Sequence, residues 1–141
     1  MAKKWTLMAA AVAAAALCTG AQAKAGDTIA VADLQWKEMF PGVKFALSYG
    51  DWEKGAHGKF VRIDHGTKVP LHLHSNDYHA VLISGRMANL FEGGQRTEVG
   101  PGDYFYMAGK RPHAHECMTQ DGCFFYTYGA EAWDIELSGA E

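Results

Sequence analysis

The sequence contains no run or stripe of basic residues, and its 13 lysines and arginines are outnumbered by 16 aspartates and glutamates. This balance gives no support to a nucleic-acid partner, because proteins that bind nucleic acids concentrate positive charge on one face. Helical periodicity is nearly absent beyond the alanine-rich start of the chain, and no internal repeat or low-complexity tract is visible there. The pattern therefore favours strands over helices.

The chain has one long apolar run, and it lies at the start. The alanine-rich segment Thr6–Gly20 follows two lysines, and Ala21–Ala23 has the small-x-small pattern that a signal peptidase accepts. The run is too short for a membrane-spanning helix. We therefore predict a signal peptide over residues 1–23, with cleavage after Ala25 as the alternative. The mature protein is expected to be periplasmic or secreted, with no remaining membrane segment.

The predicted mature chain is short. Removing 23 of the 141 residues leaves 118, and the loss of the two lysines changes the formal net charge from −3 to −5. A chain of this length forms one domain around a single core. We expect residues 24–41 to form an N-terminal arm and residues 42–141 to form the domain.

Short apolar or alternating segments recur at intervals of roughly 8–12 residues, separated by glycine, aspartate and proline. These segments are Val43–Tyr49, Phe60–Ile63, Tyr78–Ile83, Met87–Phe91, Asp103–Met107, Cys123–Tyr128 and Trp133–Leu137. In the first of them every second residue is apolar, as in a strand with one buried face. The rhythm predicts an all-β domain of the sandwich, barrel or jelly-roll type.

Histidines gather in two places in the sequence. His72 and His74 are two residues apart, so in a strand both side chains project from the same face, close enough to share one metal ion. A bare pair of this kind also fits polar residues on a solvated face. Pro70 before the pair, and the second cluster at His113 and His115, favour the metal site.

Two of the three cysteines lie beyond the predicted signal peptide, at Cys117 and Cys123. They flank a segment that ends in Asp121 and Gly122, a common turn signal. Cysteines on both sides of a hairpin can lie at bridging distance, and an oxidising compartment permits the bond. The sequence is consistent with a disulfide across a hairpin or with two buried free thiols.

Two spaced motifs resemble those of the cupin family. The first consists of Gly66, His72, His74, Tyr78 and Gly85. The second consists of Gly94, Val99–Asp103 and Ala108–His113. The resemblance covers residues 42–137, and in particular the chain is similar to small, single-domain exported bacterial cupins.

The resemblance implies a double-stranded β-helix, the jelly-roll barrel of cupins. It also implies that His72, His74 and His113 converge inside the barrel on one metal ion. In most metal-binding cupins the fourth ligand is a glutamate, and Tyr78 stands in its place here. His79 follows by one residue, so it faces away unless a bulge turns it inward. The alternatives are a three-histidine site with open positions, an all-histidine site that includes His79, and no metal.

Other side chains are candidates for lining the pocket or its mouth. They are Tyr78, Asn89, Tyr104, Tyr106 and His115. Tyr104 and Tyr106 share one strand face, and Asn89 could contact an anionic ligand. The histidine shares a strand face with His113 and competes with it for the metal. His57 and His65 lie in segments with the composition of loops, so we expect both at the surface.

The expected cofactor is a divalent transition metal (iron, manganese, zinc, copper or nickel), since imidazole alone does not select between such ions. An open metal position favours a small metalloenzyme of oxygenase or isomerase type that acts on a small organic molecule. The missing glutamate and the lack of a visible acid–base pair favour instead a non-enzymatic domain that binds or senses a metal or small ligand. The resemblance to cupins also implies a homodimer.

Overall fold

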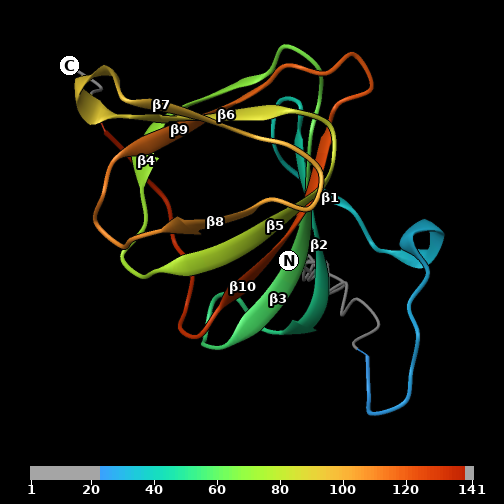
Figure 1. The fold of residues 1–141 in the computed structure, drawn as a ribbon. Helices are drawn as coiled ribbons and strands as arrows, with labels where there is room; N and C mark the ends of the chain where they lie inside the picture. The colour runs from blue at the N-terminus through green and yellow to red at the C-terminus, as the bar shows by residue number, and fades with distance from the viewer. Residues whose placement is uncertain (1–22, 139–141) are drawn as a thin grey trace, which may run out of the picture.

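The computed structural model describes residues 23–138, so the predicted signal peptide lies outside the described residues except for its last position. Two antiparallel sheets face each other across the core (Figure 1). The six-stranded sheet has the order β1 (Lys37–Phe40), β2 (Val43–Gly50), β3 (His57–Ile63), β10 (Cys123–Gly129), β5 (Tyr78–Ser84), β8 (Tyr104–Met107). The five-stranded sheet has the order β11 (Glu136–Leu137), β4 (Lys68–Leu73), β9 (His113–Cys117), β6 (Met87–Phe91), β7 (Arg96–Val99). Two short 3-10 helices, η1 (Val31–Asp33) and η2 (Glu92–Gly94), complete the described elements.

The chain passes back and forth between the two sheets. Strand β10 pairs with both β3 and β5, and β9 pairs with both β4 and β6, so most neighbouring strands are distant in the sequence. Such long-range antiparallel pairing in two facing sheets is the arrangement of a jelly roll. The predicted all-β, single-domain jelly-roll barrel is confirmed.

The core lies between the sheets, where alternate residues of each strand point inward. In β3 the side chains of Val61 and Ile63 are buried, while Arg62 between them is exposed. The buried apolar set includes Val43, Phe45, Leu82, Met87, Phe105, Met107 and Phe125. Full burial of each such side chain contributes about 1.5–3 kcal/mol. The barrel is therefore held together by its apolar faces.

Part of the expected N-terminal arm belongs to the sheet. Residues Lys37–Phe40 form β1, which pairs antiparallel with β2 at the sheet edge. The Trp36 ring, just before β1, lies 6.1 Å from that of Phe124, and the guanidinium of Arg62 lies over it. The arm thus covers the outer face of the six-stranded sheet.

The last predicted strand, Trp133–Leu137, is wrong over most of its length, because only Glu136–Leu137 pairs with β4. Trp133 instead packs inward, where its ring lies 5.3 Å from that of Phe45. The backbone N–H of Trp133 donates a hydrogen bond to the carbonyl of Trp52 at 2.6 Å. This connection between β10 and β11 therefore covers one end of the barrel.

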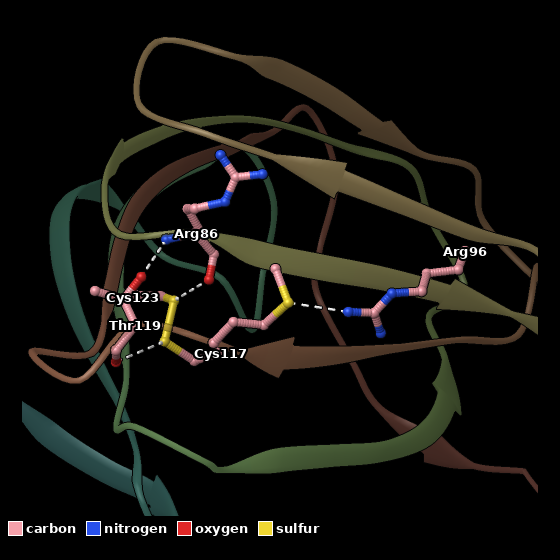
Figure 2. The surroundings of a disulfide bond; sticks show 6 residues. Arg86, Arg96, Cys117, Thr119 and Cys123 are labelled. Atoms are coloured by element: carbon pink, nitrogen blue, oxygen red, sulfur yellow. Dashed lines mark hydrogen bonds between the residues drawn. A yellow bond between two sulfur atoms is a disulfide. The ribbon is translucent and has the colours of Figure 1, made fainter.

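The Cys117–Cys123 disulfide is confirmed, but the predicted hairpin is wrong (Figure 2). Cys117 ends β9 in one sheet and Cys123 begins β10 in the other, so the bond joins the two sheets. The intervening loop is held in place because the backbone N–H of Arg86 donates to the Thr119 hydroxyl at 2.6 Å. The cysteines meet because the chain crosses between sheets at this point, not because two strands of one sheet turn back.

We expect the protein with both Cys117→Ala and Cys123→Ala to fold but to lose about 2 kcal/mol of unfolding free energy, because the bond closes a short loop. Urea denaturation of the wild type and the double variant measures the difference. Thiol titration of the unfolded, non-reduced wild type should find no free thiol from this pair. Two reactive thiols per chain would show that the bond is absent.

Candidate metal centre

Three histidine side chains converge inside the barrel from two paired strands. His72 lies in β4, His74 lies directly after it, and His113 lies in β9 opposite His72. All three are buried, and their potential ligand nitrogens lie within 4.8 Å of one another. The structure therefore brings together the three residues that the cupin motifs imply.

A β-bulge in β4 turns these histidines inward. Val69 pairs with His115 and His72 pairs with His113, so three steps along β4 match two along β9. The extra residue lies at Pro70–Leu71, where proline removes a backbone donor and is compatible with a bulge. As a result Val69 and His72 are both buried although their positions differ by an odd number.

Backbone carbonyls fix the tautomer of each imidazole. The Nδ1–H of His72 donates to the Pro70 carbonyl at 2.7 Å, and that of His113 donates to the Arg111 carbonyl at 2.9 Å. The Nδ1–H of His74 donates to the carbonyl of Asp134. Because a carbonyl oxygen only accepts, each Nδ1 must carry the proton and each Nε2 keeps a lone pair.

Burial keeps these three side chains uncharged at neutral pH. It lowers the pKa of His72, and it lowers the pKa of His74 to about 3 and that of His113 to about 4. The physical cause is the loss of solvation of the charged imidazolium. Neutral imidazoles with free Nε2 atoms are the form that binds a transition metal, so the donor set fits zinc, copper, iron or nickel.

Tyr78 and His115 form a hydrogen-bonded chain beside the three histidines. The Nδ1–H of His115 donates to the Asn89 side-chain oxygen at 2.8 Å, and the Tyr78 hydroxyl donates to His115 Nε2 at 3.0 Å. Both ring nitrogens of His115 are thus engaged, which leaves none for a metal. The same hydroxyl lies 3.5 Å from His113 Nε2. Burial raises the pKa of Tyr78, so its side chain stays a neutral phenol.

His79 lies on the outer face of the barrel, away from the three histidines. Its side chain is exposed, and its Nδ1 and the Tyr104 hydroxyl are 2.6 Å apart. No bulge interrupts the pairing of β5 with β8 at this position. The structure therefore does not place His79 in an all-histidine site.

Two of the expected pocket residues also face outward. Tyr104 is 59% exposed and Tyr106 is 46% exposed, because they alternate along β8 with the buried Phe105 and Met107. The expectation that these tyrosines line the pocket mouth is wrong. Tyr106 instead donates a hydrogen bond to Asp77 at 2.7 Å on the outer surface.

A cavity adjoins the histidines inside the barrel. His72, His74, Tyr78 and His115 contribute to its lining. Most of the remaining lining is apolar or aromatic, including Phe45, Val61, Phe125 and Trp133. The Trp133 ring lies 5.2 Å from that of His74. A small organic molecule in this cavity would contact both the imidazoles and the apolar strand faces.

The family model of the ChrR cupin-like domain matches residues 24–131. The chain belongs to the ChrR cupin-like domain family. No curated protein sequence matches it. No helix among the described residues is long and apolar enough to cross a membrane.

Solved structures of several proteins share the fold. KdgF from Halomonas sp. is 17% identical, with 74% of this chain and 94% of that one covered and a TM-score of 0.62. The polyketide cyclase RemF from Streptomyces resistomycificus is 15% identical, covers 82% and 87%, and has a TM-score of 0.70. The DMSP lyase DddQ from Ruegeria pomeroyi is 18% identical, covers 76% and 62%, and has a TM-score of 0.63. These likenesses establish the fold alone.

Sequence reasoning missed two buried basic residues of this cupin. His57 was expected at the surface but is 1% exposed, and its Nδ1 bonds to the Gly55 carbonyl at 2.9 Å. Lys59 is 2% exposed and lines the cavity. Both alternate with Val61 along β3, so extending the inward parity of that strand by two steps would have found them. His65 is exposed, as expected.

The Lys59 ammonium has no hydrogen-bond partner among the described residues. It lies 3.9 Å from the Trp133 ring centroid and 5.0 Å from that of Phe45. Each such contact stabilises a cation by about 0.5–2 kcal/mol. Burying an ammonium costs several kcal/mol. The burial lowers the pKa of Lys59 to about 7, which means that the buried ammonium destabilises the fold.

Replacing His74 by alanine should abolish tight metal binding and leave the barrel folded, because the core is apolar and the imidazole only supplies a ligand. His72→Ala and His113→Ala should behave in the same way. Metal content of protein purified without a histidine tag, measured beside circular dichroism, gives both results.

His79→Ala is the matched control, since it removes an imidazole from the outer face and should leave metal content unchanged. A loss in this variant equal to that in His74→Ala would place His79 among the ligands. Wild-type metal content in all three inner variants would show that these histidines hold no metal.

Proposed function

We propose that this cupin is an exported metalloenzyme of oxygenase or isomerase type that acts on a small organic molecule. The metal would be held by His72, His74 and His113, and the cavity beside them would bind the substrate. The coordination chemistry of the imidazoles supports metal binding, and the apolar lining of the adjoining cavity supports binding of an organic molecule.

One observation carries the proposal: each Nδ1 of the three histidines is tied to a backbone carbonyl, so each Nε2 keeps a lone pair for a metal, and His72 and His74 also line the cavity. Three protein ligands leave coordination positions for water or substrate, as catalytic sites require. A metal bound there would polarise a carbonyl or lower the pKa of a water molecule.

Tyr78 supports an open site. It occupies the position where most metal-binding cupins have a glutamate ligand, and its hydroxyl donates to His115. As a neutral phenol it is a poor ligand for a divalent ion. Among the described residues, the site therefore has three nitrogens and no carboxylate, and most of the cavity beside it is apolar.

A non-enzymatic binding or sensor domain is the alternative. It is favoured by the lining of the cavity, which includes no aspartate or glutamate among the described residues. No carboxylate is there to transfer a proton, and the histidines are already engaged: three would bind the metal, and both ring nitrogens of His115 are hydrogen-bonded. A metalloenzyme and a sensor differ in whether the metal keeps an exchangeable position, and that difference can be measured.

We expect cobalt(II)-loaded protein to show visible absorption bands that change when azide is added, because azide enters an open coordination position. His79→Ala should give the same response, and His74→Ala should give no protein-bound spectrum. A cobalt spectrum that azide does not change would indicate a closed site and contradict the enzyme proposal.

Export is part of the proposal, and it is supported by the disulfide between Cys117 and Cys123, since such bonds persist in oxidising compartments. Amino-terminal sequencing of the protein from a periplasmic fraction should give a chain that begins at Lys24, or at Gly26 for the alternative cleavage site. A chain that still begins at Met1 would contradict export.

A further inference from the structure

Lys59 is a cation placed inside an apolar cavity without an anion. Its side chain points inward from β3, it is 2% exposed, and its Nζ has no hydrogen-bond partner among the described residues. Of the ion pairs formed by the described residues, none includes it. A buried charge that the fold does not pair points to a ligand that pairs it.

Lys59 lies in the same cavity as two of the metal-site histidines. His72, His74 and Lys59 all contribute to its lining. The Trp133 ring contacts both kinds of side chain, since it lies 3.9 Å from Lys59 Nζ and 5.2 Å from the His74 ring. A molecule that fills the cavity would therefore meet both the ammonium and the imidazoles.

We propose that Lys59 binds the carboxylate of a small organic acid whose apolar part packs against the walls of the cavity. This inference rests on the proposed function, because it names the substrate class of the same site. The carboxylate would receive a charge-assisted hydrogen bond from the ammonium and would remove the unpaired charge from the apolar interior.

The surroundings of Lys59 favour a carboxylate over a phosphate. A phosphate needs several donors, and the Thr127 hydroxyl, which also lines the cavity, donates to the Lys59 backbone carbonyl instead. The rings of Phe45 and Trp133 flank the ammonium. One cation between aromatic walls therefore fits a monoanion with an apolar body.

The test compares acids with their neutral amides on zinc-loaded protein by isothermal titration calorimetry. The probes are benzoate against benzamide and butyrate against butyramide. Wild type should bind each acid roughly tenfold or more tightly than its amide, because only the acid pairs with the ammonium. Lys59→Met should lose most of this preference and keep only the part that comes from attraction of the carboxylate to the zinc ion.

Lys44→Met is the matched control, because it removes one positive charge from an exposed position on the neighbouring strand β2. It should keep the wild-type preference. The inference is overturned if Lys59→Met keeps the wild-type preference for the acids, if Lys44→Met loses the preference equally, or if wild type binds none of the acids.

Metal content, measured on the same samples, separates this inference from the proposed function. Lys59→Met should retain the metal content of the wild type. A chain that holds no metal but shows a Lys59-dependent preference for acids would refute the metalloenzyme and leave the carboxylate site standing. A chain that holds metal but shows no such preference would refute the carboxylate site and leave the metalloenzyme proposal standing.

Stability provides a second readout that distinguishes a ligand-binding lysine from a structural one. Burial lowers the pKa of Lys59 to about 7, whereas an unfolded lysine has a pKa of about 10.4. Between these values the unfolded chain binds more protons, so the wild type should gain stability as the pH rises from about 7 to about 10. His57 and His74, whose charges would act on Lys59, have lowered pKa values and stay neutral in this range.

Lys59→Met lacks the buried charge, so it should unfold at a higher temperature than the wild type at about pH 6, with the difference shrinking above about pH 7. Thermal unfolding followed by circular dichroism at a series of pH values measures the difference. A Lys59→Met variant less stable than the wild type at about pH 6 would show that the aromatic contacts make this lysine a structural element, and would overturn the inference.

Discussion

The inner faces of the two sheets enclose an apolar interior, where a buried polar group destabilises the fold unless it finds a partner. An imidazole, phenol or amide buried without a partner destabilises the fold by more than its hydrogen bond would contribute. The backbone supplies most of the partners in this barrel. The carbonyls of Pro70, Arg111 and Asp134 accept from three imidazoles, and that acceptance leaves the opposite ring nitrogens unprotonated. The arrangement that satisfies the buried donors is thus the same one that prepares a metal site.

These carbonyls are available only because several irregular segments take particular shapes. The bulge in β4 directs the Pro70 carbonyl toward His72. The segment after β4 holds the connection between β10 and β11 through two hydrogen bonds: Asn76 donates to the Ala132 carbonyl at 2.9 Å, and the Ser75 backbone N–H donates to the Asp134 carboxylate at 2.7 Å. Movement of this connection would move both the acceptor of His74 and the Trp133 ring that covers the cavity. The geometry of the site therefore depends on loops as much as on strands.

Strand parity predicted that His72 and His74 share a face and that His79 lies on the opposite one, and the cupin motifs implied that the shared face is the inner one. Parity also put Tyr104 and Tyr106 on one face, but which face that is depends on the pairing of β8 with β5. The sequence also did not predict that the disulfide joins the two sheets, because nothing local to Cys117 and Cys123 shows that they lie in different sheets. Lys59 escaped notice because a lysine beside a glycine and a histidine has the composition of a solvated segment. The predicted strand began at Phe60, whereas β3 begins at His57, so the inward face shared with Val61 was not extended to Lys59.

Compared with a cupin that has a glutamate ligand, both Tyr78 and Lys59 make the cavity more positive. In a cupin with a glutamate ligand, one negative charge offsets part of the charge of a divalent ion. Here a neutral phenol stands in that position, and the three imidazoles are neutral as well, so the whole charge of such an ion would remain uncompensated. Lys59 adds a further cation to the same low-dielectric space, where charges interact far more strongly than in water. Two like charges enclosed together repel each other unless an anion enters with them. The loss of the carboxylate and the presence of the lysine thus have one common consequence: metal and organic anion should bind more tightly together than either binds alone.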